Sequence, residues 1–578
     1  MQLVRRYRMP ALFCALAVLL CELIAHPFAE MGICDDGPYI LVAQHLAATG
    51  HIAYNGWSAA MLVWQLYLGA ALIKIFGFSF TIVRMSTLVV AIATAFVLQR
   101  TLVRSGVSER TATFGTLALV LSPMYLMLSA TFMSDIHGVF AIVLCLYGCL
   151  RALQSPTARA AISWLCFAVA TNVLCGTSRQ LAWLGALVMV PCTVWLLRAQ
   201  RRLFFAGVAV AFAGYLSILF CMHWLKLQPY TTPEHFALGW FPVLNTLHQF
   251  ASFFLDFPIL LFPLALLFWS QIRKSRLRVA SLIVLVGWLF LTVYPSHLRG
   301  VFSLILEPTF YDWVTPAGNF SGSALRGNSP VFLTLGVRVV LTLAALGGLL
   351  GLIASFFNTS RSPHTFQTPG QLSWKSLAIL LGPFTLAYIT LLVYRAITIA
   401  NAGTPEILDR YALGLLVTAV VVLARYYQER IQLRLPLAMF VFIAITAAYG
   451  VVVTHNTFAF YRARVALAAE LRAVGIPDTS VDNGWEDNID VELQQAGHVN
   501  NPGIVDPADA YEPVTPPDGI CKMFWYNYTP HIHPIYGVSF DPNACYGPAP
   551  FEPVHYSRWL ASSSGTLYAI WYIPASNP

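Results

Sequence analysis

Charged residues are scarce in this sequence. Of 578 residues, 26 are Asp or Glu and 34 are Lys or Arg, so 10% are charged, whereas 58% are hydrophobic. A soluble domain usually carries about 25% charged residues, so the composition indicates a polytopic membrane protein. The net charge of +8 does not indicate nucleic acid as a partner, because the basic residues gather in short loops between apolar runs. This pattern is typical of an orientation signal in a membrane protein.

Several common catalytic signatures are absent as well. The sequence contains no Walker loop, no Rossmann fingerprint, no serine nucleophile elbow and no paired CxxC motif. Nine of the 11 cysteines lie in the apolar part and are interpreted as small buried hydrophobic residues. Only Cys521 and Cys545 lie in a polar region. If that region is outside the cytoplasm, a disulfide between them is expected.

Apolar runs of about 20 residues, the length that crosses a bilayer, recur along the chain. We predict thirteen spans, at 10–28, 80–100, 111–130, 136–152, 160–177, 181–198, 203–222, 247–270, 279–294, 330–356, 375–397, 411–427 and 435–455. Basic residues at every second junction place the N-terminus in the cytoplasm and the C-terminus outside. The run 58–76 is amphipathic, and counting it as a span would invert the later loops, so we interpret it as a juxtamembrane helix. The first run is interpreted as an uncleaved signal-anchor, although the sequence is also compatible with cleavage near Ala29.

The chain divides into two parts by composition. Residues 1–455 form the predicted transmembrane domain, in which 29–79 is the first loop outside the cytoplasm. Residues 456–578 are polar and rich in Pro, Gly, Asn and aromatics. Alternation from Thr566 to Ile573 is typical of a strand. The fold class expected is therefore an α-helical polytopic membrane protein with a small C-terminal extracytoplasmic α+β domain.

Two adjacent carboxylates, Asp35 and Asp36, follow the first apolar run. The next residues, 39–49, predict a short helix on the membrane surface, with Pro38 at its start and Gly50 at its end. The carboxylates would then lie at a helix N-terminus, where the partial positive charge favours their ionised form. Such a group at the membrane boundary can act as a general base or as a cation ligand. The alternative interpretation is a solvated N-cap.

Further polar candidates lie at predicted span ends on the same side. Asp135 and His137 open one span, and ionisable residues there are often functional, because their burial is costly; a solvated loop aspartate and a hydrogen-bonding histidine are the alternatives. Arg179 and Arg410 carry planar guanidinium groups that suit phosphate oxygens. Either arginine could instead reach the lipid headgroups. Tyr411 follows Arg410 directly.

The order of these motifs resembles the GT-C glycosyltransferases, in particular the branch that includes bacterial protein-O-mannosyltransferase-like and aminoarabinose-transferase-like enzymes. The residues that carry the resemblance are Asp35-Asp36, Gly50, Phe76-Gly77, Arg84, Ser122-Pro123, Asp135 and Arg410-Tyr411. The likeness covers about the first 150 residues and the Arg-Tyr motif; the middle spans match in hydropathy alone. Asp-Asp stands where many relatives have Asp-Glu, and the Lys-Pro-Pro of relatives is missing.

The resemblance implies an inverting transfer of a hexose or pentose from a polyprenyl-phosphate donor to a hydroxyl of a protein, lipid or glycan acceptor. It implies a bacterial inner-membrane enzyme of GT-C type, acting on the outer side among membrane lipids, with periplasmic juxtamembrane helices. Asp35 matches the general base, while Asp36 and Asp135 would orient the substrates or hold a divalent cation. His137, Arg179, Arg410 and Tyr411 are the expected substrate-binding residues. We expect no metal, because hard cations require six or more oxygen ligands.

Two other functions remain as alternatives. A transporter or flippase for lipid-linked sugars would place broken helices and charges near the middle of the membrane, often in two matching halves. Here the charged candidates collect at one face and no two halves match. The third possibility is a non-catalytic envelope-assembly protein in which the C-terminal domain is the active part, and in which Asp35 would be dispensable.

Overall fold

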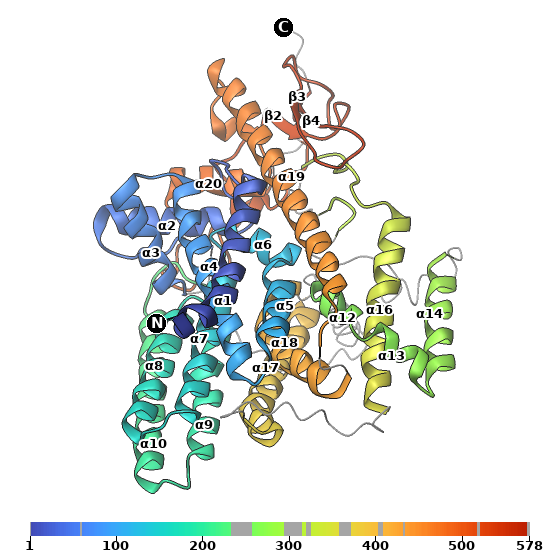
Figure 1. The fold of residues 1–578 in the computed structure, drawn as a ribbon. Coiled ribbons are helices and arrows are strands. Elements are labelled where there is room, and N and C mark those ends of the chain that lie inside the picture. Colours follow the sequence, from blue (N-terminus) through green and yellow to red (C-terminus); the bar gives the residue numbers. More distant parts are fainter. Residues whose placement is uncertain are drawn as a thin grey trace.

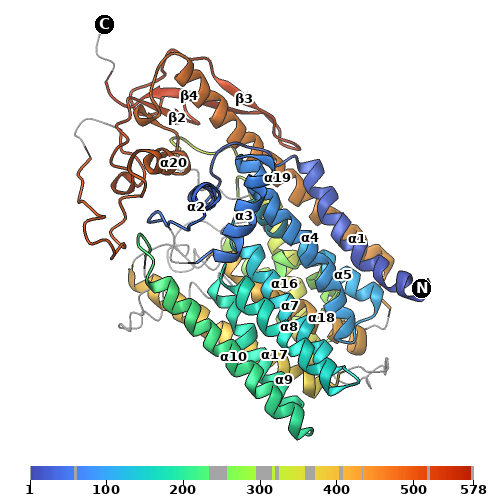
Figure 2. The ribbon, with the colours of Figure 1, turned by 90° about the vertical axis from the view of Figure 1, so that its left-hand side faces the viewer.

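The computed structural model describes residues 2–57, 61–232, 257–293, 315–318, 325–357, 372–402, 408–431, 434–516 and 521–574. In these ranges a bundle of long helices carries a smaller domain with a four-stranded sheet at one end (Figures 1 and 2). Eight of the described helices are long and apolar enough to cross a membrane, or nine if one bent pair counts as a single span. The helical membrane fold is confirmed, but the predicted count of thirteen spans is not.

The described helices of the bundle follow the predicted spans closely in most places. Those that correspond to one span each are α1 (Gln2–Ala25), α4 (Phe80–Arg104), α7 (Asp135–Leu153), α8 (Ala158–Gly176), α10 (Arg201–Lys226), α14 (Arg278–Val293), α16 (Leu335–Phe357) and α17 (Trp374–Ala402). A late span consists of η3 (Asp409–Ala412), α18 (Leu413–Tyr426) and η4 (Tyr427–Ile431), and the last one opens with η5 (Leu437–Met439).

Two predicted spans differ from a single helix. The run 181–198 is divided into η1 (Gln180–Trp183), the π-helical turn η2 (Gly185–Met189) and α9 (Val190–Leu196). The run 247–270 lies partly outside the described residues, and its described part forms two short helices, α12 (Phe262–Leu266) and α13 (Trp269–Lys274). Hydropathy alone does not reveal such breaks, because each piece is as apolar as an unbroken helix.

The predicted span 111–130 is a bent pair of helices. α5 (Glu109–Val120) and α6 (Pro123–Ser129) meet at an angle of 67°. The sequence explains the bend, because Pro123 has no backbone N–H to continue the helix and is well suited to a first helical turn. Ser122 caps the new helix, and its Oγ accepts a hydrogen bond from the Tyr125 amide at 3.3 Å.

Contacts between helix ends show which of them lie together at each end of the bundle. At one end Arg84, in the first turns of α4, contacts Asp36 of the first loop. At the other end the Arg425 guanidinium donates to the Ser105 carbonyl, and the Arg104 carbonyl accepts from the Gln154 amide. The predicted cytoplasmic basic residues, such as Arg104 and Arg425, therefore lie at the end opposite to the acidic pair.

Two short helices cover the end that carries the acidic pair (Figure 2). α2 (Asp36–Thr49) ends at Gly50, whose φ of 80° is left-handed and whose amide donates to the Leu46 carbonyl. α3 (Val63–Phe76) ends at Gly77, whose φ of 87° again suits glycine. Residues of both helices share one buried apolar cluster. Both predicted juxtamembrane helices are thus present, apart from 58–60, which lie outside the described residues.

The C-terminal domain is built on a continuation of the last helix. α19 (Phe440–Ala473) has 34 residues, or about 50 Å at 1.5 Å per residue, which exceeds the bilayer core of about 30 Å. It therefore runs through the position 455 at which the sequence places the domain boundary. Beyond it lie η6 (Asp478–Ser480), β1 (Val481–Asp482), α20 (Trp485–Ala496), η7 (Tyr526–Tyr528), β2 (Tyr536–Ser539), β3 (Val554–Tyr556) and β4 (Gly565–Trp571).

The sheet has the strand order β1-β2-β4-β3. β1 pairs with β2 in parallel, and the β2–β4 and β3–β4 pairs are antiparallel. The strand expected from Thr566 to Ile573 corresponds to β4. Cys521 and Cys545 form a disulfide with their Cα atoms 5.7 Å apart. The expected α+β fold and the expected cysteine pair are therefore both confirmed.

A buried ion pair joins α19 to α20. Arg464 Nη1 lies 3.1 Å from Glu486 Oε2, and both side chains are fully buried. The Tyr461 hydroxyl donates to the other carboxylate oxygen of Glu486 at 2.6 Å. Since an isolated charge is costly to bury, these partners fix the position of α20 against the long helix.

The first loop packs against α20 through two glycines. The Gly32 amide donates to Asp490 Oδ2 at 3.2 Å. A Cβ atom at Gly37 would lie 2.6 Å from Asp490 Oδ1, so this position has no room for a side chain. Burial, followed by the nearby charges of Asp487 and Asp36, raises the pKa of Asp490 well above its usual value of 3.8. The C-terminal domain therefore touches the loop that carries the acidic pair.

We expect Arg464→Met to lower the free energy of unfolding by about 3–5 kcal/mol, because Glu486 would remain buried without its cation. Arg472→Met is the matched control on the same helix, since Arg472 lies 3.6 Å from Asp478 and the two side chains are 51% and 35% exposed. An exposed pair contributes only about 0–1 kcal/mol. Unfolding in detergent micelles measures both variants. Equal losses would contradict the structural role of the buried pair.

We expect Asp490→Asn to change how stability depends on pH. Because the folded pKa of Asp490 is raised, its contribution to stability is complete below the unfolded value of 3.8 and is lost as the pH rises toward the folded pKa. Asparagine keeps the shape and does not titrate. The thermal midpoint of the variant, relative to wild type, should therefore rise between about pH 4 and pH 8. The exposed Asp509→Asn is the control, and a parallel pH profile in all three proteins would refute the assignment.

Candidate active site at the first loop

Asp35 lies at the start of α2 and faces a late segment of the chain. Its Oδ2 atom is 3.0 Å from Nη2 of Arg410, which lies 375 residues away in sequence. The Asp35 side chain is 24% exposed and that of Arg410 is 13% exposed. The sequence therefore predicted two residues that the fold brings into contact, at a place that solvent or a ligand can reach.

Asp36 faces the opposite way, into the protein. Its side chain is completely buried against Arg84, with Nε–Oδ2 and Nη2–Oδ1 distances of 2.7 and 2.9 Å. Both carboxylate oxygens also accept backbone amides, from Ile33 at 2.7 Å and from Phe132 at 3.0 Å. Two further Arg84 hydrogens bond the carbonyls of Ala29 and Met31. This network holds the first loop on α4 and on the segment that leads to Asp135.

Asp135 begins α7 and pairs with Arg179. Arg179 Nη1 lies 2.9 Å from Asp135 Oδ1 and 3.3 Å from Oγ of Ser134. The Asp135 side chain is fully buried, while Arg179 is 16% exposed. Gly138 makes room for this pair, because a Cβ atom there would lie 2.9 Å from Cδ of Arg179. This second ion pair is therefore more enclosed than the one between Asp35 and Arg410.

Tyr411 connects the two ion pairs. The Arg179 guanidinium carbon lies 5.0 Å from the centre of the Tyr411 ring, within the range of a cation–π contact. Tyr411 follows Arg410 in η3, and its carbonyl accepts the Tyr388 hydroxyl at 3.0 Å. The fold thus joins two aspartates, two arginines and one tyrosine from four separate segments.

Tyr39 confirms that these groups share one neighbourhood. Burial, and next the carboxylate of Asp35, raise the pKa of the Tyr39 phenol well above its usual value. The charges of Arg410 and Asp135 act on the same phenol. One side chain of α2 is therefore close to members of both ion pairs.

His137 lies apart from the ion pairs in its contacts. Its side chain is fully buried in the first turn of α7, and Nε2 lies 3.4 Å from the Thr87 hydroxyl. A ligand cannot touch the ring in this conformation. Its expected role in substrate binding therefore stays a prediction that the contacts do not support directly.

Each exposed or enclosed carboxylate of the site is paired with an arginine. Among the described residues, no three His, Cys, Asp or Glu side chains gather in a group that could hold a metal. Asp35 and Asp135 each contact an arginine instead. Guanidinium groups offer several hydrogens to phosphate or carboxylate oxygens.

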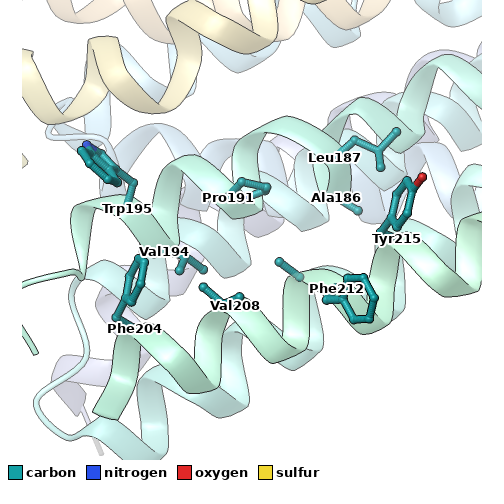
Figure 3. A pocket seen from close by; sticks show the side chains of 10 residues that line it. Ala186, Leu187, Pro191, Val194, Trp195, Phe204, Val208, Phe212 and Tyr215 are labelled. Carbon is teal, nitrogen blue, oxygen red and sulfur yellow. The ribbon is translucent and has the colours of Figure 1, made fainter. Parts of the chain in front are cut away.

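An apolar groove of about 450 Å³ lies between the segment 186–195 and α10. Figure 3 shows apolar side chains of both helices facing it, among them Pro191, Val194, Phe204 and Phe212. Of the described residues that line it, Tyr215 supplies the one hydroxyl, and none carries a carboxylate, imidazole or guanidinium.

Three further residues of this site were not among the expected site residues. Arg84 was named only among the residues that carry the resemblance, although an arginine inside an apolar run signals a buried partner. Tyr39 was named only as the first residue of the helix expected at 39–49. Tyr388 lies within a long apolar run and gave no signal at all.

No protein-family model and no curated protein matches this chain. Among solved structures, ArnT from Cupriavidus metallidurans bound to undecaprenyl phosphate is 17% identical, with a TM-score of 0.33 over 72% of this chain and 76% of that chain. The archaeal oligosaccharyltransferase AglB from Archaeoglobus fulgidus, in complex with an inhibitory peptide and a dolichol-phosphate, is 14% identical, with a TM-score of 0.39 over 90% of this chain and 63% of that chain. At these identities and TM-scores the likeness transfers no residue role and no substrate to this chain.

Proposed function

We propose that this protein is an inverting glycosyltransferase, which moves a sugar from a polyprenyl-phosphate donor to a hydroxyl acceptor at the membrane surface. One observation carries the proposal: the half-open Asp35–Arg410 pair lies beside the enclosed Asp135–Arg179 pair at one end of a membrane helix bundle. The reaction needs a base for a hydroxyl and cations for a phosphate leaving group. Both kinds of group are present in this cluster.

Asp35 is the group best placed to act as the base. Of the three candidate carboxylates, only Asp35 is exposed, whereas the side chains of Asp36 and Asp135 are completely buried. A general base must come within hydrogen-bond reach of the proton that it takes. The acceptor hydroxyl would pass its proton to Asp35 as its oxygen bonds to the anomeric carbon, and the bond from that carbon to the phosphate oxygen breaks.

The two arginines stabilise the negative charge that develops on the leaving phosphate. The donor phosphodiester carries one negative charge, and the polyprenyl phosphate that leaves carries a second. Fixed cations at the place where charge develops stabilise the transition state. Arg179 packs on the ring of Tyr411, Arg410 precedes Tyr411 in the chain, and the two arginines supply two such cations. Asp36 is a positioning residue, because it holds the loop in which Asp35 lies.

The proposed function also implies a location for the site in the cell. We place the site on the outer side of a bacterial inner membrane, with the N-terminus in the cytoplasm and the domain 456–578 outside. The disulfide of that domain favours an oxidising compartment, and the basic residues at the opposite end of the bundle favour a cytoplasmic location for that end. The acceptor is a hydroxyl of a protein, a lipid or a glycan, and the sugar is a hexose or a pentose.

The first test is sugar transfer in proteoliposomes, with a panel of radiolabelled polyprenyl-phosphate sugars. We expect wild type to consume one donor, and Asp35→Asn to be about 10²–10⁴-fold slower, the usual contribution of a general base, while the variant still binds the donor. Donor that crosses the bilayer without bond cleavage, equally in both proteins, would identify a transporter instead. Full activity in the variant would remove Asp35 from the mechanism.

The second test separates the roles of the two neighbouring aspartates. We expect Asp36→Asn to lose about 3–5 kcal/mol of stability, because Arg84 would remain buried without its counter-charge. Asp35→Asn should lose much less, because its pair is partly exposed. Thermal unfolding of both variants in the same detergent compares them. An inactive Asp36→Asn with wild-type stability would instead indicate direct contact with a substrate.

A further inference from the structure

The two ion pairs of the site differ in how far their carboxylates are exposed. The arginines are similar, with Arg179 16% and Arg410 13% exposed. Asp135 is completely buried, whereas Asp35 is 24% exposed and meets Arg410 through Nη2 and Oδ2 at 3.0 Å. Loss of Arg179 would leave Asp135 buried without a cation, whereas Asp35 can exchange Arg410 for solvent, so a ligand separates the second pair at the lower cost.

We propose that Arg410 exchanges partners when the donor binds. In the free protein it holds the carboxylate of Asp35, and in the complex it holds the donor phosphate and releases Asp35. This inference rests on the proposed function and adds an order to it: both oxygens of the base are open to the acceptor only after the donor is in place. An acceptor that arrives first meets an Asp35 oxygen already occupied by a guanidinium hydrogen.

The movement of charge during the reaction favours this exchange. When Asp35 takes the proton of the acceptor hydroxyl, its charge changes from −1 to 0. As the sugar–phosphate bond breaks, the charge of the phosphate changes from −1 to −2. One negative charge thus moves from Asp35 to the phosphate, and an arginine beside both can follow it. Arg179 cannot, because its partner Asp135 is buried and takes no part in the proton transfer.

The exchange also explains why the neighbouring aspartate is held so firmly. Asp36 is fixed by Arg84 and two backbone amides, so the loop keeps its place when Asp35 loses its partner. The release therefore requires a change in side chains alone. The loop stays in position with the base directed toward the site.

A consequence is that Asp35 and the phosphate compete for one guanidinium. Removal of the Asp35 charge should then strengthen the binding of a lipid phosphate, although it abolishes the reaction. We expect Asp35→Asn in nanodiscs to bind undecaprenyl phosphate roughly three- to tenfold more tightly than wild type. If the Asn variant fails to fold, Asp35→Ser tests the same direction.

A double-mutant cycle identifies the partner. The gain should vanish in the Arg410→Met background, because the competition is for that side chain. Glu109→Gln is the matched control at the opposite end of the bundle, since Arg100 and Glu109 are 3.1 Å apart with exposures of 16% and 31%. This variant should bind the lipid phosphate as wild type does.

The outcomes distinguish the inference from the function on which it rests. Equal or weaker binding by Asp35→Asn, in a protein whose wild type transfers sugar, overturns the exchange and leaves the glycosyltransferase in place. A gain that persists without Arg410 also overturns it, because the competition would then involve another group. Failure of wild type to bind any lipid phosphate or to transfer sugar would refute both.

Discussion

The buried pair between Asp36 and Arg84 is the interaction on which the rest of the site depends. A charge in an apolar bundle is tolerated only when it is paired and hydrogen-bonded, and here every carboxylate oxygen is occupied. The pair fixes α2 to α4 and to the segment before Asp135. Because neighbouring residues at a helix start point in different directions, anchoring Asp36 inward turns Asp35 toward Arg410. Two adjacent aspartates thereby acquire different tasks.

The path of the chain across the membrane explains how distant residues meet. After every two crossings of the membrane the chain is back at the same end of the bundle. The segments before α2, α7, η1 and η3 therefore all lie at one end. Polar side chains that are costly inside the bundle collect at such ends. Each polar side chain at that end therefore finds its ion-pair or hydrogen-bond partner among the residues of the same end, as the helices and loops pack. The C-terminal domain contacts this end as well, since α20 lies against the first loop.

Local signals in the sequence predicted the ends of two short helices of the site. Gly50 was expected to end its helix, the run 58–76 ends before Gly77, and both glycines have positive φ. The start of α6 at Ser122-Pro123 was not predicted, although its signal is equally local, because hydropathy marks 111–130 as one span. The cysteine pair was predictable, because only two cysteines lie in the polar tail.

The choice of partners could not be predicted in this way. Nothing near Asp35 in sequence indicates Arg410, and nothing in the motif Asp35-Asp36 indicates which carboxylate is buried. That choice depends on the shape of the loop after packing, which Gly32 and Gly37 permit by their close approach to Asp490. The predicted domain boundary at residue 455 falls inside α19 for another reason. The second half of α19 is more polar than the first half. This change in composition indicates a new domain, although the helix continues.

The balance of charge in the site limits what can bind there. The two ion pairs make a neutral cluster, so an anion gains a cation only by displacing a carboxylate or by adding to a guanidinium that is already paired. The Asp135–Arg179 pair resists displacement because Asp135 would be left fully buried without its cation. The exposed pair loses less, because solvent or the incoming ligand can replace the lost contact. Selectivity for an anion at this position therefore depends less on the number of arginines than on which of them has an accessible partner.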